Sequence, residues 1–109
     1  MELALRGKIA LVTGASEGIG RAIGEALAAE GVHLTLCARR AAPLQALAAA
    51  LESQHGVSAL PVAADLSTEA GIDTLVQAHQ ARFGALDILV NNAGSIRAGS
   101  LISKPEAEW

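Results

Sequence analysis

The sequence predicts an α/β fold in which helices cover both faces of a parallel sheet, and three observations support this prediction. Short apolar runs alternate with segments whose apolar residues recur at helical spacing, as in repeated βαβ units. Hydrophobic residues make up 51% of the chain, which has one Phe, one Trp and no Tyr, so the expected core is aliphatic. Connections are short, and 109 residues are enough for one domain.

The four expected strands are short apolar runs bounded by turn residues. The first ends before Gly14 and the last ends before Asn91. Because parallel strands are joined by right-handed crossovers, the helices between them should lie on both faces of the sheet. The strands are expected at residues 8–13, 32–38, 58–63 and 86–90.

Three helices are expected between these strands. They run from about residue 19 to Gly31, from Pro43 to Gly56, and from residue 67 or 68 to Phe83. Proline is favoured in the first turn of a helix and glycine just past its end. Apolar residues recur at helical spacing at Ile19, Ala22, Ile23, Ala26 and Leu27, at Leu44, Leu47, Ala48 and Leu51, and at Ile72, Leu75, Val76 and Phe83.

A further helix is expected to begin near the end of the chain. Ser103 and Glu106 have the spacing of a capping box, and the sequence stops at Trp109, within the first turn of that helix. We therefore interpret residues 1–109 as a single domain that is incomplete at its C-terminus.

Composition and charge argue against several classes of protein. The net charge is −3 with no run of Lys or Arg, so no nucleic-acid partner is expected. Cys37 is the only cysteine and lies in an apolar run, which predicts a buried structural thiol. His33, His55 and His79 lack metal-ligand spacing and are interpreted as strand and helix-surface residues, so no metal site is predicted. No segment approaches the roughly 20 apolar residues of a membrane span, and a cytoplasmic protein is the default expectation.

A glycine-rich turn, Thr13-Gly14-Ala15-Ser16-Glu17-Gly18-Ile19-Gly20, joins the first strand to the first helix. Gly14 allows a sharp turn, Gly18 leaves room for a phosphate at the helix N-terminus, and Gly20 allows the helix to pack closely on the strand. Amides and the positive end of the helix dipole then favour the pyrophosphate of a dinucleotide, as in a Rossmann-type fold. The alternative is a tight turn that binds no ligand.

The end of the second strand bears on the choice of dinucleotide. An NAD site usually offers a carboxylate there, whereas an NADP site offers Arg to the 2′-phosphate. Here Ala38 stands in place of the acid, and Arg39 and Arg40 follow. Glu17 argues the other way, because a nearby carboxylate repels a phosphate. NADP(H) is the predicted cofactor, with NAD(H) as the alternative.

Two motifs resemble those of the short-chain dehydrogenase/reductase family. They are T-G-x-x-x-G-x-G at residues 13–20 and Asn91-Asn92-Ala93-Gly94 after the fourth strand, and Asp65 follows the third strand where that family places an acid near the adenine. The resemblance extends from about Lys8 to the end of the chain. It implies the first half of a doubly wound Rossmann-type sheet with strand order 3-2-1-4-5-6-7, in which the fourth strand here is left at an open edge.

The resemblance also implies roles for single residues. The pyrophosphate and adenosine ribose would be surrounded by Gly14, Ser16, Gly18, Ile19 and Gly20. Asp65 and Leu66 would border the adenine, unless Asp65 is a capping or solvated carboxylate. The nicotinamide-side ribose would lie along Asn91, Ala93 and Gly94, and Asn91 would also tie the central strands together, which is an alternative explanation for its presence.

The activity implied by the resemblance is hydride transfer between a nicotinamide and a carbonyl or alcohol carbon, possible substrates including 3-oxoacyl groups. The family's catalytic Tyr and Lys lie four residues apart on a later helix. This sequence has no Tyr, and its lysines, Lys8 and Lys104, are in the wrong places. The chain is therefore expected to supply cofactor binding without catalytic residues, to be inactive alone, and to form a homo-oligomer in the full-length parent.

Two other classes of function remain open. One is a non-enzymatic nucleotide-binding remnant of a disrupted gene. The other is a methyltransferase-like domain that binds S-adenosylmethionine, which Asn91–Gly94 and the arginine pair disfavour.

Overall fold

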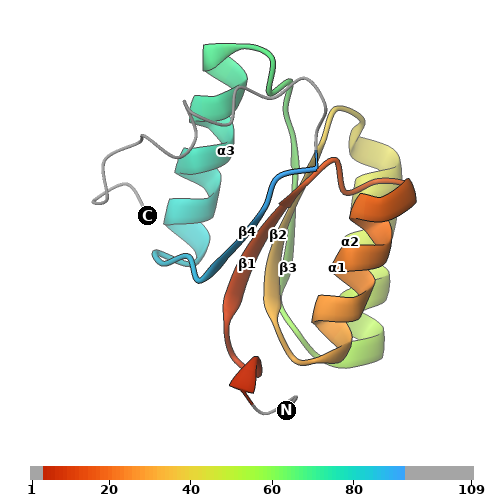
Figure 1. The fold of residues 1–109 in the computed structure, drawn as a ribbon. Helices are drawn as coiled ribbons and strands as arrows, with labels where there is room; N and C mark the ends of the chain where they lie inside the picture. The colour runs from red at the N-terminus through yellow and green to blue at the C-terminus, as the bar shows by residue number, and fades with distance from the viewer. Residues whose placement is uncertain (1–3, 93–109) are drawn as a thin grey trace.

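A computed structural model describes residues 4–92, which form a four-stranded parallel sheet in the order β3-β2-β1-β4 (Figure 1). This order agrees with the predicted one, in which the first strand is central and the fourth lies at an edge. The strands are β1 (Ile9–Thr13), β2 (His33–Ala38), β3 (Ala59–Ala63) and β4 (Ile88–Val90).

Helices lie on both faces of the sheet, so the doubly wound architecture is confirmed (Figure 1). Two of them, α1 (Gly18–Ala29) and α2 (Ala41–His55), cover one face, and α3 (Glu69–Arg82) covers the other. Side chains of a strand point alternately to the two faces. Ala10 and Val12 of β1 accordingly pack in the core beneath α1 and α2, and Leu11 packs in the core beneath α3.

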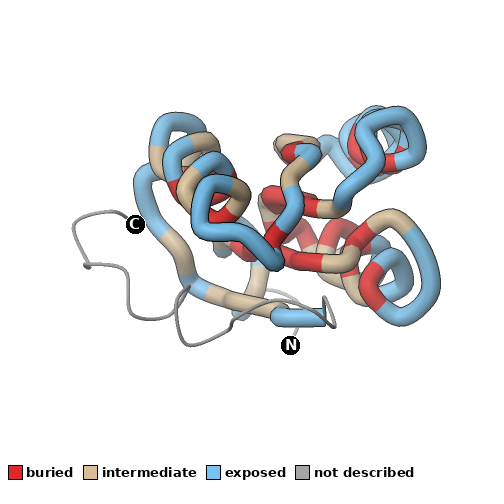
Figure 2. Tube along the Cα trace, turned by 90° about the horizontal axis from the view of Figure 1, so that it is seen from above, coloured by how far each residue is buried: buried red, intermediate tan, exposed pale blue. Residues whose placement is uncertain are grey.

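Buried residues line the central strands and the helix sides that face them, as Figure 2 shows. The first core contains Leu34, Leu36, Leu44 and Leu51, and the second contains Leu75. All of these are aliphatic, as the composition predicts. β4 is different, because each of its residues is only half-buried.

The strands end together at one edge of the sheet. In the parallel register Thr13 pairs with Cys37, Val12 with Val90, and Ala38 with Ala63. The segments that leave the carboxyl ends of all four strands therefore begin side by side. In open α/β sheets this edge, near the point where strand order reverses, is where ligands bind.

The helix α1 packs through small residues rather than through the apolar residues that periodicity singled out. Its buried positions are Gly20, Gly24 and Ala28. Ile23 and Leu27 are half-buried, whereas Ala22 and Ala26 are exposed. The physical reason is close approach to the sheet: a Cβ at Gly24 would lie 3.3 Å from Cδ2 of Leu36.

Element boundaries differ from the predicted ones at a few points. β1, β2 and β3 each begin one residue later, and β4 begins at Ile88 rather than at Leu86. The helix α2 begins at Ala41, so Pro43 lies inside the first turn instead of opening it. That position tolerates proline because the first amides of a helix lack intrahelical partners. The helix expected near Ser103 falls outside the described residues.

Within residues 4–92, no helix is both long and apolar enough to cross a membrane. The same part of the chain contains no cluster of three or more His, Cys, Asp or Glu residues placed to hold a metal ion.

Candidate functional site

The glycine-rich turn leaves β1 and enters α1 at the carboxyl edge of the sheet. Gly14 and Gly18 have φ angles of 61° and 62°, a left-handed conformation that favours glycine. A Cβ at Gly20 would collide with the backbone carbonyl oxygen of Gly14, so the third glycine permits the tight fold of the turn. The amide of Ala15 donates to the carbonyl of Cys37 at 3.0 Å and so ties the turn to β2.

The first turn of α1 is open to an anion. Its N-cap residue, Glu17, has an extended backbone, and its side chain makes no capping hydrogen bond. Among the described residues nothing lies within 4 Å of the position that a Cβ at Gly18 would take, so these residues leave space at this point of the helix. Uncapped amides and the positive end of the helix dipole attract negative charge.

Ile19 lies beside this opening with 70% of its surface exposed, and it is the one large hydrophobic residue among those described that is exposed to this degree. Exposed single apolar side chains are common. Ile19 nevertheless places an exposed apolar surface in the first turn of α1.

Thr13, Asn91 and Asn92 link the ends of β1 and β4. The buried Thr13 hydroxyl lies 3.2 Å from Oδ1 of Asn91 and 3.4 Å from the carbonyl oxygen of Val90, both of which are acceptors. The amide of Asn92 donates to the same hydroxyl at 2.8 Å, and its Nδ2 donates to the carbonyl of Gly14 at 3.3 Å.

The bond between Thr13 and Asn91 joins the end of β1 to the residue that follows β4, and is of the strand-linking kind expected for Asn91. These hydrogen bonds also reveal two residues that the predicted set of site residues omitted, Thr13 and Asn92. Both belong to the two motifs, and the signal that could have identified them was that each carries a hydrogen-bonding side chain where a strand ends, Thr13 as the last residue of β1 and Asn92 shortly after β4.

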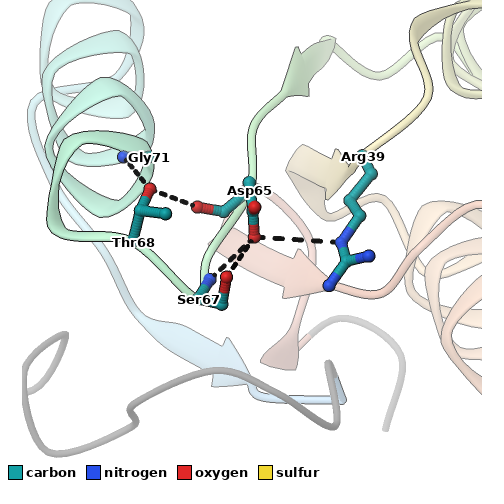
Figure 3. A network of polar contacts seen from close by, with 5 residues as sticks. All are labelled: Arg39, Asp65, Ser67, Thr68 and Gly71. Atoms are coloured by element: carbon teal, nitrogen blue, oxygen red, sulfur yellow. Dashed lines mark hydrogen bonds and ion pairs between the residues drawn. The ribbon is translucent and has the colours of Figure 1, made fainter.

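Asp65 follows β3 and organises the start of α3 (Figure 3). Its Oδ1 accepts hydrogen bonds from the amide and the hydroxyl of Ser67, at 3.0 and 2.7 Å. Its carbonyl oxygen accepts from the hydroxyl of Thr68 at 3.0 Å, and that hydroxyl accepts from the amide of Gly71 at 2.9 Å, as an N-cap should.

Hydrogen bonds from the Ser67 hydroxyl and amide, with a smaller contribution from the charge of Arg39, hold the pKa of Asp65 below its ordinary value. The carboxylate therefore stays ionised at neutral pH. Asp65 thus has a structural role in the loop, which was one of the two interpretations of this residue, and half of its side chain remains exposed, at 50%.

Arg39 and Arg40 follow β2 at the same edge. The Nε atom of Arg39 lies 3.8 Å from Oδ1 of Asp65, and 67% of its side-chain surface is exposed. Arg40 is exposed and is the N-cap residue of α2. Both arginines therefore follow the strand that pairs with β1, whose carboxyl end begins the glycine-rich turn.

Leu66 is buried in the core beneath α3, so contact with a ligand would have to involve its backbone. Ser16 is half-buried in the turn. Ala93 and Gly94 lie outside the described residues. The cysteine prediction is confirmed: Cys37 is buried, and burial raises the pKa of its thiol to about 12.

The interpretation of His79 as a helix-surface residue is wrong, because its side chain is buried. Its ring is fully buried between α3 and β2, with Nδ1 2.7 Å from the Thr35 hydroxyl and Nε2 2.8 Å from the carbonyl oxygen of Ala85. Periodicity alone did not mark position 79 as inward, because histidine is not counted among the apolar residues. It is nevertheless seven residues after Ile72, on the same helix face.

Comparisons with known proteins agree with this geometry. The family model described as short chain dehydrogenase matches residues 8–109. The rhamnolipid-biosynthesis 3-oxoacyl-(acyl-carrier-protein) reductase of Pseudomonas aeruginosa is 44% identical over 105 residues, which are 96% of this chain and 40% of that protein. The 3-oxoacyl-(acyl-carrier-protein) reductase of Escherichia coli is 42% identical over 103 residues, 94% of this chain and 41% of that protein.

Among solved structures, L-sorbose reductase of Gluconobacter frateurii, complexed with NADPH and L-sorbose, superimposes with a TM-score of 0.83 at 46% identity. The match covers 86% of this chain and 36% of that one. The chain thus spans less than half the length of the relatives it matches. Because the family model covers nearly all of it and the strand order and glycine-rich turn agree, the chain belongs to the short-chain dehydrogenase family.

Proposed function

We propose that residues 1–109 form one NAD(P)-binding domain of an oxidoreductase that transfers hydride between a nicotinamide and a carbonyl or alcohol carbon. The observation that carries this proposal is the open first turn of α1. Uncapped amides, left-handed glycines at 14 and 18 and unobstructed space at Gly18 together fit a pyrophosphate. The bound dinucleotide would supply the hydride acceptor or donor.

The chain's own residues would bind and orient that dinucleotide. The turn, through Gly14, Ser16, Gly18, Ile19 and Gly20, would hold the pyrophosphate and adenosine ribose. Asp65 and the backbone of Leu66 would border the adenine. The nicotinamide-side ribose would lie along Asn91, Ala93 and Gly94, with Asn91 held in place by Thr13.

NADP(H) is the proposed cofactor, and NAD(H) is the alternative. Arg39 and Arg40 stand at the end of β2, where a guanidinium can pair with a 2′-phosphate through several N–H donors. Relatives support the choice: L-sorbose reductase was solved with NADPH, and RhlG of Pseudomonas aeruginosa, 44% identical to this chain, was solved with NADP. Glu17 is exposed, so solvent and salt weaken its repulsion of a phosphate.

The proposed substrate class is a small carbonyl compound or alcohol. Two relatives named above are 3-oxoacyl reductases, which supports a 3-oxoacyl substrate. We propose no catalytic residue among residues 1–109, because the chain contains no Tyr to act as proton donor. The chain alone would be inactive, and the full-length enzyme would be a cytoplasmic homo-oligomer without nucleic-acid or membrane partners.

A charge placed at the mouth of α1 tests the proposal. Ile19→Asp puts a carboxylate at the second position of the helix, where it stabilises the helix dipole but repels a pyrophosphate. In the purified protein we expect the dissociation constants of NADPH and NADH to rise by roughly tenfold or more, with no loss of thermal stability.

Ile19→Asn is the matched control, because it removes the same apolar surface without adding charge. It should weaken binding much less than Ile19→Asp. Equal effects of the two variants on both cofactors would contradict a pyrophosphate site at this helix, and so would wild-type protein that binds neither cofactor.

The second candidate function is a nucleotide-binding remnant without enzymatic activity. Sequencing the coding DNA beyond the Trp109 codon separates the two. A Tyr-x-x-x-Lys pair in frame on the next part of the chain supports the enzyme, and an immediate stop codon supports the remnant.

A further inference from the structure

The segments that follow β2 and β3 leave the sheet together and bring Arg39 beside Asp65. Ala38 pairs with Ala63 in the strand register, and the amide of Ala64 donates to the carbonyl of Ala38 at 3.0 Å. Immediately beyond this bond, Nε of Arg39 lies 3.8 Å from Oδ1 of Asp65 (Figure 3). The sheet therefore fixes the distance between the two backbones.

Asp65 is the rigid member of this pair. Its Oδ1 accepts two hydrogen bonds from Ser67, and its backbone carbonyl accepts one from Thr68. A Cβ at Gly71 would collide with that carbonyl, which shows how closely α3 packs on residue 65. Arg39 has a long side chain that is 67% exposed, so it is the member of the pair that loses conformational entropy when its orientation is fixed.

The contact is made through Nε of Arg39. Figure 3 shows the Arg39 side chain reaching toward the Asp65 carboxylate, with the ion pair drawn at Nε. This ion pair restricts the orientations that the Arg39 guanidinium adopts at the end of β2.

Building on the proposed function, we propose that Asp65 is a positioning residue for cofactor selection: it orients the Arg39 guanidinium to receive the 2′-phosphate of NADP(H). A side chain that is already oriented loses less entropy when it pairs with phosphate, so the pair favours NADPH over NADH. This role is distinct from a contact between Asp65 and the adenine, which NADPH and NADH share and which would affect both equally.

The negative charge of Asp65 acts in the opposite direction, since it repels a phosphate. Both side chains of the pair are at least half exposed, so water and salt screen this repulsion over the longer distance to a phosphate on the far side of the guanidinium. Orientation should therefore outweigh repulsion near physiological ionic strength.

The experiment measures the ratio of the NADH and NADPH dissociation constants for the purified protein. Asp65→Asn should lower the preference for NADPH by roughly threefold to fivefold, the range expected for an exposed ion pair. Ser67→Ala keeps the carboxylate charge but removes its shortest hydrogen bond, and should lower the preference in the same direction by a smaller factor. If repulsion dominated, Asp65→Asn would raise the preference and Ser67→Ala would leave it unchanged.

The two neighbouring arginines provide the matched backgrounds. In an Arg39→Ala background, Asp65→Asn should no longer change the ratio, whereas in an Arg40→Ala background its full effect should remain. Equal weakening of both cofactors by Asp65→Asn, or an unchanged effect in the Arg39→Ala background, would overturn the inference while leaving the cofactor site intact. Wild-type protein that binds neither cofactor would instead overturn the proposed function.

Discussion

His79 is a polar residue whose environment is entirely internal. The carbonyl of Ala85 can only accept a hydrogen bond, so Nε2 carries the proton and Nδ1 accepts from the Thr35 hydroxyl. Phe83 packs against the same ring, with centroids 5.4 Å apart. The side chain thus joins the middle of β2 to α3 and to the turn before β4.

Burial lowers the pKa of His79 from its ordinary 6.5, which makes the fold sensitive to mild acid. The unfolded chain binds this proton near pH 6.5, whereas the folded chain binds it only at lower pH, so stability is lost as pH falls below about 6.5. Asp65, whose pKa is lowered from 3.8, affects the stability of the fold only at more acidic pH.

We expect the free energy of unfolding to decrease between pH 7 and 5 in the wild-type protein and to be nearly constant there in His79→Gln. Chemical denaturation at a series of pH values measures this. His55→Gln, at an exposed position, is the control and should follow the wild type. A wild-type curve parallel to that of His79→Gln would contradict the burial of a neutral imidazole.

At the scale of elements, the sequence predicted which helices and strands are present better than it predicted the residues at which they begin and end. All four strands and three helices within residues 4–92 were predicted, because glycines and the change from strand to helical spacing mark them clearly. The buried face of α1 was not predicted. Periodicity is judged from large apolar residues, whereas this helix packs on the sheet through Gly20 and Gly24.

The same limit applies to the candidate site. Motif spacing brought the glycine-rich turn, Arg39, Asp65 and Asn91 to one edge of the sheet. It did not predict the Arg39–Asp65 pair or the hydrogen bonds of Thr13, because such contacts depend on strand register and side-chain rotamers that a single sequence does not specify.

Two glycines of α1 should differ sharply in their tolerance of alanine. In Gly20→Ala the added Cβ meets the backbone carbonyl of Gly14, which cannot move without opening the turn. In Gly24→Ala it meets the end of the Leu36 side chain at 3.3 Å, which can shift, and alanine improves helix propensity by about 1 kcal/mol.

We therefore expect Gly20→Ala to lower the free energy of unfolding by about 1–3 kcal/mol or more, and Gly24→Ala to change it little. Urea denaturation of the two variants alongside the wild type measures both. Similar stabilities for the two would show that α1 does not pack as closely on β1 as the structure indicates.

At the scale of the whole molecule, helices cover both faces of the sheet, but the described part of the chain pairs β4 on one side only. Within residues 4–92 its neighbour is β1 alone, and its residues are half-buried. An edge strand with open amides and apolar side chains favours association with other chains.

A protein consisting of residues 1–109 alone is therefore expected to be marginally stable or to self-associate. Sedimentation velocity over a range of concentrations, combined with thermal melts at each concentration, tests this expectation. A monomer at all concentrations with a cooperative, concentration-independent melt would contradict it.

The bonds between Asn92, Thr13 and Gly14 have a consequence for biosynthesis. They join residues separated by 78 or 79 positions in the sequence, and they hold the end of β1 where the glycine-rich turn begins. While the nascent chain is still being translated, that turn has no anchor on its β4 side until residue 92 has left the ribosome. The end of β1 and the start of the glycine-rich turn should therefore take their final shape late, well after β1 itself has been made.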